Sequence, residues 1–196
     1  MREMSTPPLA DLSEYRNVTD LLMRRIQEAP DHPAFDVREG GQWHPVSTAA
    51  FGAKVRAVAK GLVADGLRRG DAVAIMASTR YEWAVADLAI WFAGGVVVPV
   101  YDSSAPGQVA TIVADADVRV AFSGDESSRA ALDAAGVPAV ISLADGLAGL
   151  AERGVDVEDA ALESARTHAG PASPATIVYT SGTSGTPKRV VLSHEN

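Results

Sequence analysis

The residues best suited to chemistry form one short run near the end of the chain, from Thr180 to Lys188. Five of the seven residues from Thr180 to Thr186 carry a hydroxyl, and the other two are glycines. Glycines let backbone N–H groups approach an anion closely, and hydroxyls add rotatable donors. Lys188 adds a positive charge that suits a phosphate group. The run therefore predicts a loop that binds a polyphosphate. Its predicted binding residues are Thr180, Ser181, Gly182, Thr183, Ser184, Gly185, Thr186 and Lys188.

This loop differs from the Walker A motif, G-x-x-x-x-G-K-[ST], which is followed by a helix. Here Thr186 and Pro187 separate Gly185 from Lys188, and residues 190–192 are an apolar run that predicts a strand. A loop between two strands gains little from a helix dipole, so backbone amides and hydroxyls must supply the anion contacts. A flexible Ser/Thr/Gly linker is the alternative interpretation, although such linkers do not usually lie between two apolar strands.

Strands and helices alternate through most of the chain before the loop. Short apolar or β-branched runs predict buried strands, and apolar residues at helical spacing predict helices. The expected strands are residues 72–77, 95–101, 118–122, 138–141 and 175–180, and the expected helices are residues 18–26, 51–63, 81–92, 106–116, 126–135, 147–153 and 157–167. This alternation predicts an α/β fold with a mostly parallel sheet and helices on both faces.

The N-terminal region precedes this alternation. Residues 1–17 are expected to form an extended arm, because two adjacent prolines there disfavour a helix. Residues 33–46 predict a β-hairpin with a Gly-Gly turn, and either Ser47 or Thr48 can cap the helix that follows. We therefore expect one arm, residues 1–17, and one domain, residues 18–196.

The composition argues against several classes of function. The net charge is −8, with 25 acidic and 17 basic residues, so the basic face of a nucleic-acid-binding protein is not expected. The chain has no cysteine, which removes disulfides and thiolate metal sites and fits a reducing compartment. No secretory signal and no membrane-spanning segment are expected. We expect a soluble, cytoplasmic protein, while peripheral membrane contact and the oligomeric state stay open.

Two stretches of the sequence resemble a known enzyme superfamily. The run 177–194 resembles the signature of the AMP-forming adenylating enzymes, which include acyl-CoA synthetases, firefly luciferase and peptide-synthetase adenylation domains. The stretch 83–105, with Asp87 and the run Val98-Pro99-Val100-Tyr101, resembles bacterial long-chain fatty-acid–CoA ligases. The resemblance covers nearly all of the chain from Val18 on. It implies part of the large N-terminal domain of an adenylate-forming enzyme.

The resemblance implies a two-step reaction. A fatty acid carboxylate attacks the α-phosphate of Mg-ATP, which gives acyl-adenylate and pyrophosphate, and the thiol of coenzyme A then displaces AMP. The implied co-substrates are ATP and CoA, with Mg²⁺ bound to a glutamate beyond Asn196. In the family this loop grips the β- and γ-phosphates, a role that passes by position to Thr180, Ser181, Gly182, Thr183, Ser184 and Lys188.

The sequence departs from the family pattern in two ways. Arg189 follows Lys188, where the family usually has glycine. If that position requires a positive φ, arginine costs roughly 1–2 kcal/mol, which is the explanation we favour; alternatively, its guanidinium adds a second cation near the phosphates. The chain also ends at Asn196, before the family's catalytic lysine. We therefore expect an N-terminal portion that is inactive alone, and assign no catalytic residue and no metal ligand.

Two other functions stay open, and several polar or aromatic residues have structural interpretations. One alternative is an adenylating relative that acts on an aryl, amino or short-chain acid, and the other is a non-catalytic, truncated chain. His194 is interpreted as a structural hydrogen-bonding residue because nothing pairs it with a nucleophile. Trp83 and Trp91 are interpreted as packing residues, and Asp115 as a helix end. Residues 101–104 follow a buried strand, where ligand sites often lie.

Overall fold

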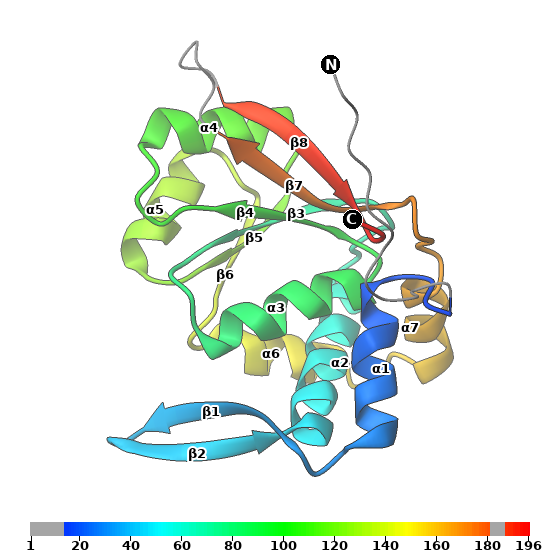
Figure 1. Ribbon diagram of the computed structural model, residues 1–196. Helices are drawn as coiled ribbons and strands as arrows, with labels where there is room; N and C mark the ends of the chain where they lie inside the picture. The colour runs from blue at the N-terminus through cyan, green and yellow to red at the C-terminus, as the bar shows by residue number, and fades with distance from the viewer. Residues whose placement is uncertain (1–13, 181–186) are drawn as a thin grey trace, which may run out of the picture.

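The computed structural model describes residues 14–180 and 187–196 and shows an α/β fold (Figure 1). Strands and helices alternate along the chain, and helices cover both faces of the main sheet, which confirms the predicted fold class. The helices are α1 (Val18–Glu28), α2 (Thr48–Ala64), α3 (Tyr81–Phe92), α4 (Pro106–Asp115), α5 (Glu126–Ala134), α6 (Gly146–Arg153) and α7 (Asp159–Arg166). The strands are β1 (Pro33–Glu39), β2 (Gln42–Ser47), β3 (Ala72–Met76), β4 (Val96–Val100), β5 (Val120–Ser123), β6 (Ala139–Ser142), β7 (Pro174–Thr180) and β8 (Lys188–Ser193).

The main sheet has six strands in the order β6-β5-β3-β4-β7-β8. Its first five strands are parallel to one another, whereas β8 runs antiparallel to β7. All five residues of β3 are buried. This is expected of a short apolar strand in a parallel sheet, because helices pack on both of its faces.

The predicted hairpin is also present, as a separate two-stranded sheet of β1 and β2. Gly40 and Gly41 have φ angles of 55° and 84°. A two-residue turn with positive φ at both positions matches the right-handed twist of the strands, and glycine adopts it without strain. Ser47 caps α2, since its hydroxyl accepts a hydrogen bond from the N–H of Ala50 at 3.2 Å.

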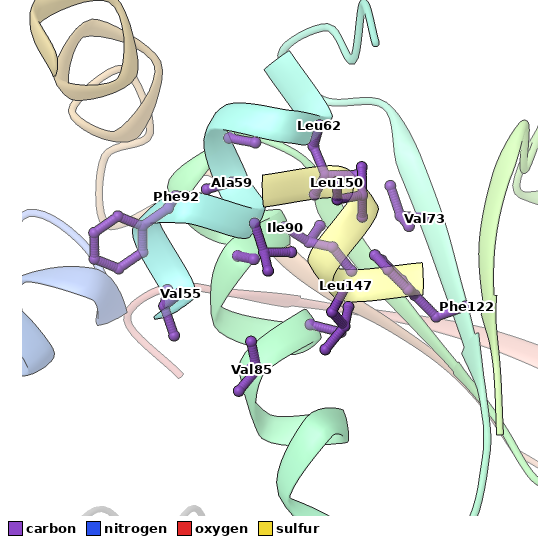
Figure 2. Close-up of a cluster of buried hydrophobic side chains, with 14 of the residues drawn as sticks. Val55, Ala59, Leu62, Val73, Val85, Ile90, Phe92, Phe122, Leu147 and Leu150 are labelled. Atoms are coloured by element: carbon purple, nitrogen blue, oxygen red, sulfur yellow. The ribbon is translucent and has the colours of Figure 1, made fainter. Parts of the chain in front are cut away.

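Alternate residues of the central strand pack into two apolar clusters on opposite faces of the sheet. Val73 and Ile75 contact a cluster built mainly from α2, α3 and α6, part of which Figure 2 shows around Ile90. Ala74 and Met76 contact a second cluster that includes residues of α4 and α5. These two clusters hold the carboxyl ends of β3 and β4 in place, and β4 in turn lies beside β7.

A buried polar network attaches the first helix to the last. Asn17 caps α1, and its side-chain amide donates to the carbonyl oxygens of Arg166 and Ala169, both at 2.9 Å. The guanidinium of Arg166, a residue only 6% exposed, donates to the carboxylate of Asp20. Residues 1–13 of the predicted arm lie outside the described residues.

Candidate phosphate-binding site

The predicted phosphate loop connects β7 to β8, so the expected strand-loop-strand arrangement is confirmed. The last pair of the hairpin joins Thr180 to Lys188, and the pair before it joins Tyr179 to Arg189. Thr180 and Lys188 therefore lie opposite each other at the two ends of the loop. The other predicted binding residues, Ser181, Gly182, Thr183, Ser184, Gly185 and Thr186, lie outside the described residues.

The loop begins at the carboxyl ends of the parallel strands, the edge where ligands bind in open α/β sheets. A cavity of about 410 Å³ lies at this edge. It is lined by Ala77, Ser78, Thr79, Trp83, Pro99, Val100, Tyr101, Asp102, Val178 and Tyr179. A second cavity, of about 340 Å³, shares several of these residues and reaches Thr180 and Pro187 beside the loop. The segment after β4 therefore lines both cavities, in agreement with its expected position.

The two sides of the hairpin present different side chains. Residues that face each other across an antiparallel pair lie on the same face, and successive residues alternate. Thr180 and Lys188 thus share one face of the hairpin, and Tyr179 and Arg189 share the other. The one residue of the predicted site that carries a positive charge, Lys188, is on the opposite face from Arg189.

The expectation of backbone strain at Arg189 is wrong. Among the described residues, the non-glycine residue with a positive φ is Asp117, at 50°. Arg189 lies within β8, where extended backbone suits any side chain, and a guanidinium nitrogen (Nη1) is 3.7 Å from Oδ2 of Asp115. The same nitrogen donates to the carbonyl oxygen of Asp115 at 3.4 Å. Arg189 is therefore paired at the end of α4, which also argues against the alternative of a second phosphate-binding cation.

Asp115 also contacts the partner of Arg189 across the hairpin. The hydroxyl of Tyr179 donates to Oδ2 of Asp115 at 2.5 Å. Burial raises the pKa of Tyr179 well above its usual range, and the hydrogen bond to Asp115 raises it further. Asp115 is the last residue of α4, as expected, but its contacts with both strands were not predicted. No local pattern indicates a contact between residues 64 positions apart.

His194 is held by structural contacts, which confirms its interpretation. Its Nδ1 atom lies 3.5 Å from the backbone nitrogen of Val18, and its ring lies edge-on to Trp91 with 6.0 Å between centroids. Burial lowers the pKa of His194. A neutral ring leaves Nδ1 able to accept the N–H of Val18, so His194 connects the end of β8 to the start of α1.

Asp87, which the sequence analysis named only as part of the family resemblance, is an unusual acid. Trp83, Asp87 and Trp91 recur at every fourth position of α3, so they form one row on that helix. Trp83 lines the larger cavity, and the indole N–H of Trp91 donates to the carbonyl oxygen of Ala175 in β7 at 2.8 Å. Burial raises the pKa of Asp87 to about 7. The available signal was an acid in the middle of an apolar helix, whose other acid, Glu82, lies in the first turn.

The described residues contain neither a cluster of metal ligands nor a helix that could cross a membrane. Residues 14–180 and 187–196 contain no group of three or more histidine, aspartate or glutamate side chains placed to hold a metal ion. In the same part of the chain, no helix combines the length and the apolar character needed to cross a bilayer.

Comparison with known proteins matches the chain to a protein family and to several relatives. Residues 22–196 match the AMP-binding enzyme family. The long-chain-fatty-acid–CoA ligase FadD15 of Mycobacterium tuberculosis is 35% identical over 205 aligned residues, and the ligase of the same name from Mycobacterium bovis shows the same identity. All of this chain is covered, but it spans only 34% of the length of either relative.

Solved structures agree with the fold. The N-terminal domain of FACL13 from Mycobacterium tuberculosis, solved with an inhibitor, has a TM-score of 0.76 and 28% identity, covering 92% of this chain and 45% of that structure. The N-terminal subdomain of NpsA from Klebsiella oxytoca, in complex with 3-hydroxybenzoyl-AMSN, has a TM-score of 0.71 and 23% identity, covering 92% of this chain and 41% of that structure. At that identity the NpsA match shows the fold alone.

Proposed function

Since this chain belongs to the AMP-binding enzyme family, we propose that it supplies the polyphosphate-binding part of an ATP-dependent, AMP-forming long-chain fatty-acid–CoA ligase. The observation that carries the proposal is the hairpin of β7 and β8, which holds Thr180 opposite Lys188 at the two ends of a Ser/Thr/Gly loop. The identity of 35% to FadD15 over the whole chain favours a long-chain fatty acid over an aryl or amino acid.

In the proposed reaction, a carboxylate oxygen of the fatty acid forms a bond to the α-phosphorus of ATP. The bond from that phosphorus to the bridging oxygen breaks, and pyrophosphate leaves. The CoA thiolate then attacks the acyl carbon, and AMP leaves with the electron pair of the broken C–O bond. Negative charge grows on the pyrophosphate in the first step, so donors fixed around it lower the barrier.

The contribution of this chain is to bind that leaving group. Lys188 supplies a full positive charge, while Thr180 and the other loop residues supply hydroxyl and amide donors. No residue of the chain is proposed as an acid, a base or a nucleophile. Mg²⁺ accompanies ATP in the proposal, but the described residues offer no acidic cluster for it, so no step is assigned to the ion here.

The two cavities at the carboxyl ends of the strands support the proposal of a small-molecule site there. The larger one combines the apolar residues Trp83, Pro99 and Val178 with polar groups of Ser78 and Thr79. Mixed apolar and polar lining is typical of small-molecule sites. A cytoplasmic location also belongs to the proposal, because a chain without cysteine fits a reducing compartment.

Binding of three phosphate compounds to the 196-residue chain tests the proposal. Calorimetric titration with Mg-ATP, Mg-pyrophosphate and AMP is expected to show binding of the first two and much weaker binding of AMP, because AMP lacks the β- and γ-phosphates. Binding of AMP as tight as that of ATP would contradict the assignment of the loop to the polyphosphate.

Catalysis by the isolated chain provides a second test. We expect no fatty-acid-dependent exchange of pyrophosphate into ATP above the background of a Lys188→Ala variant. Exchange well above that background would overturn the proposal that the chain supplies only the polyphosphate-binding part of the enzyme.

A further inference from the structure

One carboxylate contacts both strands of the hairpin, next to the pair formed by Thr180 and Lys188. Asp115 is the last residue of α4. Its carboxylate accepts a hydrogen bond from the hydroxyl of Tyr179 in β7 and forms an ion pair with the guanidinium of Arg189 in β8. Tyr179 and Arg189 face each other in the hairpin, one position before the Thr180–Lys188 pair. We call Asp115, Tyr179 and Arg189 the Asp115 cluster.

The two contacts of the cluster differ in strength. The side chains of Arg189 and Asp115 are 45% and 50% exposed, and an exposed ion pair contributes little because water screens it. Tyr179 is only 8% exposed, so the donor of its hydrogen bond to the charged carboxylate is a buried residue held by the core. The bond from Tyr179 is therefore the main link, and Arg189 adds a second one from β8.

The geometry of the hairpin extends this link to the loop. Thr180 is bonded to Tyr179 along the chain, and Lys188 precedes Arg189, so fixing one pair restrains the next. Donors that bind an oxyanion must be held in place before the anion arrives, since small displacements weaken charge-assisted hydrogen bonds. An attachment to α4 holds both ends of the loop relative to the buried part of the sheet.

We propose that Asp115 is a positioning residue for the phosphate loop, which acts by holding the Tyr179–Arg189 pair and through it the two residues at the ends of the loop. This inference rests on the proposed polyphosphate-binding function. Asp115 itself does not contact the ligand in this account, because Tyr179 and Arg189 lie on the opposite face of the hairpin from Lys188.

A pure charge effect and a loss of positioning predict changes of opposite sign in the affinity for an anion when Asp115 is replaced, so an affinity measurement tests the proposal. An Asp115→Ala variant removes one negative charge, and a field effect alone would tighten the binding of an anion. Loss of positioning instead weakens binding. We expect the Kd of Mg-pyrophosphate for the 196-residue chain to rise about tenfold in Asp115→Ala, equivalent to about 1.4 kcal/mol. A smaller rise is expected in Tyr179→Phe, which changes no charge.

Asp117→Asn is the matched control. It removes the same charge two residues away, at an exposed side chain that pairs with Arg119 at 3.7 Å. Asparagine tolerates the positive φ of this position. We expect its Kd for Mg-pyrophosphate to be equal to that of the original chain or lower.

A second measurement reports on positioning without any ligand. In ¹H–¹⁵N spectra, the amide signals of Thr180 and Lys188 are expected to move in Asp115→Ala and Tyr179→Phe, and to stay in place in Asp117→Asn. A residue that merely stabilises the fold would lower the melting temperature without changing the affinity of the folded chain.

The outcomes separate this inference from the proposed function. If the original chain binds Mg-pyrophosphate and Asp115→Ala binds it equally well or more tightly, the positioning role is overturned and the polyphosphate site stands. If the original chain does not bind Mg-pyrophosphate, the proposed function is overturned and the positioning role with it. Weaker binding by Asp115→Ala and Tyr179→Phe, together with unchanged binding by Asp117→Asn, supports the proposal.

Discussion

The main sheet contains two regions that are stabilised in different ways. In the parallel region, β3 is buried along its whole length, and Val73 and Ile75 are fully inaccessible to solvent. In the antiparallel pair at the other end, Val190 and Val191 of β8 are 41% and 47% exposed. Burial of apolar surface is the main source of stability, whereas anion binding needs donors that solvent and ligand can reach. Strands in the middle of the sheet therefore supply the buried apolar surface, and the strands at its other end supply the accessible donors.

The largest expected effect concerns the parallel region. Phe122→Ala removes a fully buried ring of β5, and we expect it to lower the free energy of unfolding by about 3–5 kcal/mol. Val191→Ala in exposed β8 is the comparison and should cost less than about 1 kcal/mol. Urea unfolding followed by circular dichroism measures both. Equal losses in the two variants would remove the distinction between the regions.

A second, pH-dependent effect concerns α3, which packs on the sheet. The pKa of Asp87 is about 7 in the folded chain, against 3.8 for the ordinary side chain. The folded state therefore holds this proton more tightly than the unfolded state. Ionisation opposes folding progressively as the pH rises from about 4 to about 7, and the full cost persists above that range.

Replacing Asp87 by Asn should remove this cost. We expect Asp87→Asn to raise the free energy of unfolding by about 2–4 kcal/mol near pH 8 and to change it little near pH 4. Urea unfolding of both proteins across this pH range provides the measurement. A constant difference between the two proteins at every pH would show that Asp87 has an ordinary pKa.

A smaller effect is expected for the outer edge of β8. Among the described residues β8 pairs only with β7, and exposed strands with apolar side chains tend to pair with other chains. Val191→Lys is expected to reduce concentration-dependent self-association while changing the unfolding free energy by less than about 1 kcal/mol. Sedimentation at several protein concentrations measures this. If the original chain is monomeric at all protein concentrations, the exposed edge of β8 does not pair with a second chain.

A small effect on stability is also expected at Arg189. Its backbone does not adopt a positive φ, so glycine relieves no strain there. Arg189→Gly should lower the free energy of unfolding by about 0.5–1 kcal/mol, because glycine is unfavourable inside a strand and the exposed ion pair adds little. Thermal unfolding measures the change, and a more stable variant would restore the strain hypothesis.

Much of the fold follows from local patterns in the sequence. The strand at residues 72–77 and the helix at residues 81–92 were expected from runs of apolar residues, and the structure has β3 and α3 at these positions. The hairpin turn followed from Gly40 and Gly41. In each case the residues that determine the strand, helix or turn are neighbours in sequence. The burial of the element and its backbone conformation can therefore be predicted from the local residue types.

The site was only partly predictable, since its contacts are long-range. The loop and Lys188 were expected from residue types, and their strand-loop-strand setting is confirmed. The strain at Arg189 was wrongly expected because the position was interpreted without its partner across the hairpin. The role of Asp115 depends on a contact with Tyr179 that no periodicity indicates. The raised pKa of Asp87 depends on the packing of α3, which only the structure shows.

Replacement of single lysines tests the central claim most directly. The chain has three lysines, and Lys54, on the exposed side of α2, offers a control that removes the same charge far from the loop in sequence. We expect Lys188→Ala to raise the Kd of Mg-pyrophosphate at least about tenfold, because a charge-assisted contact is lost, and Lys54→Ala to leave the Kd unchanged. Equal affinities for all three proteins, or equal losses in the two variants, would contradict a polyphosphate site between β7 and β8.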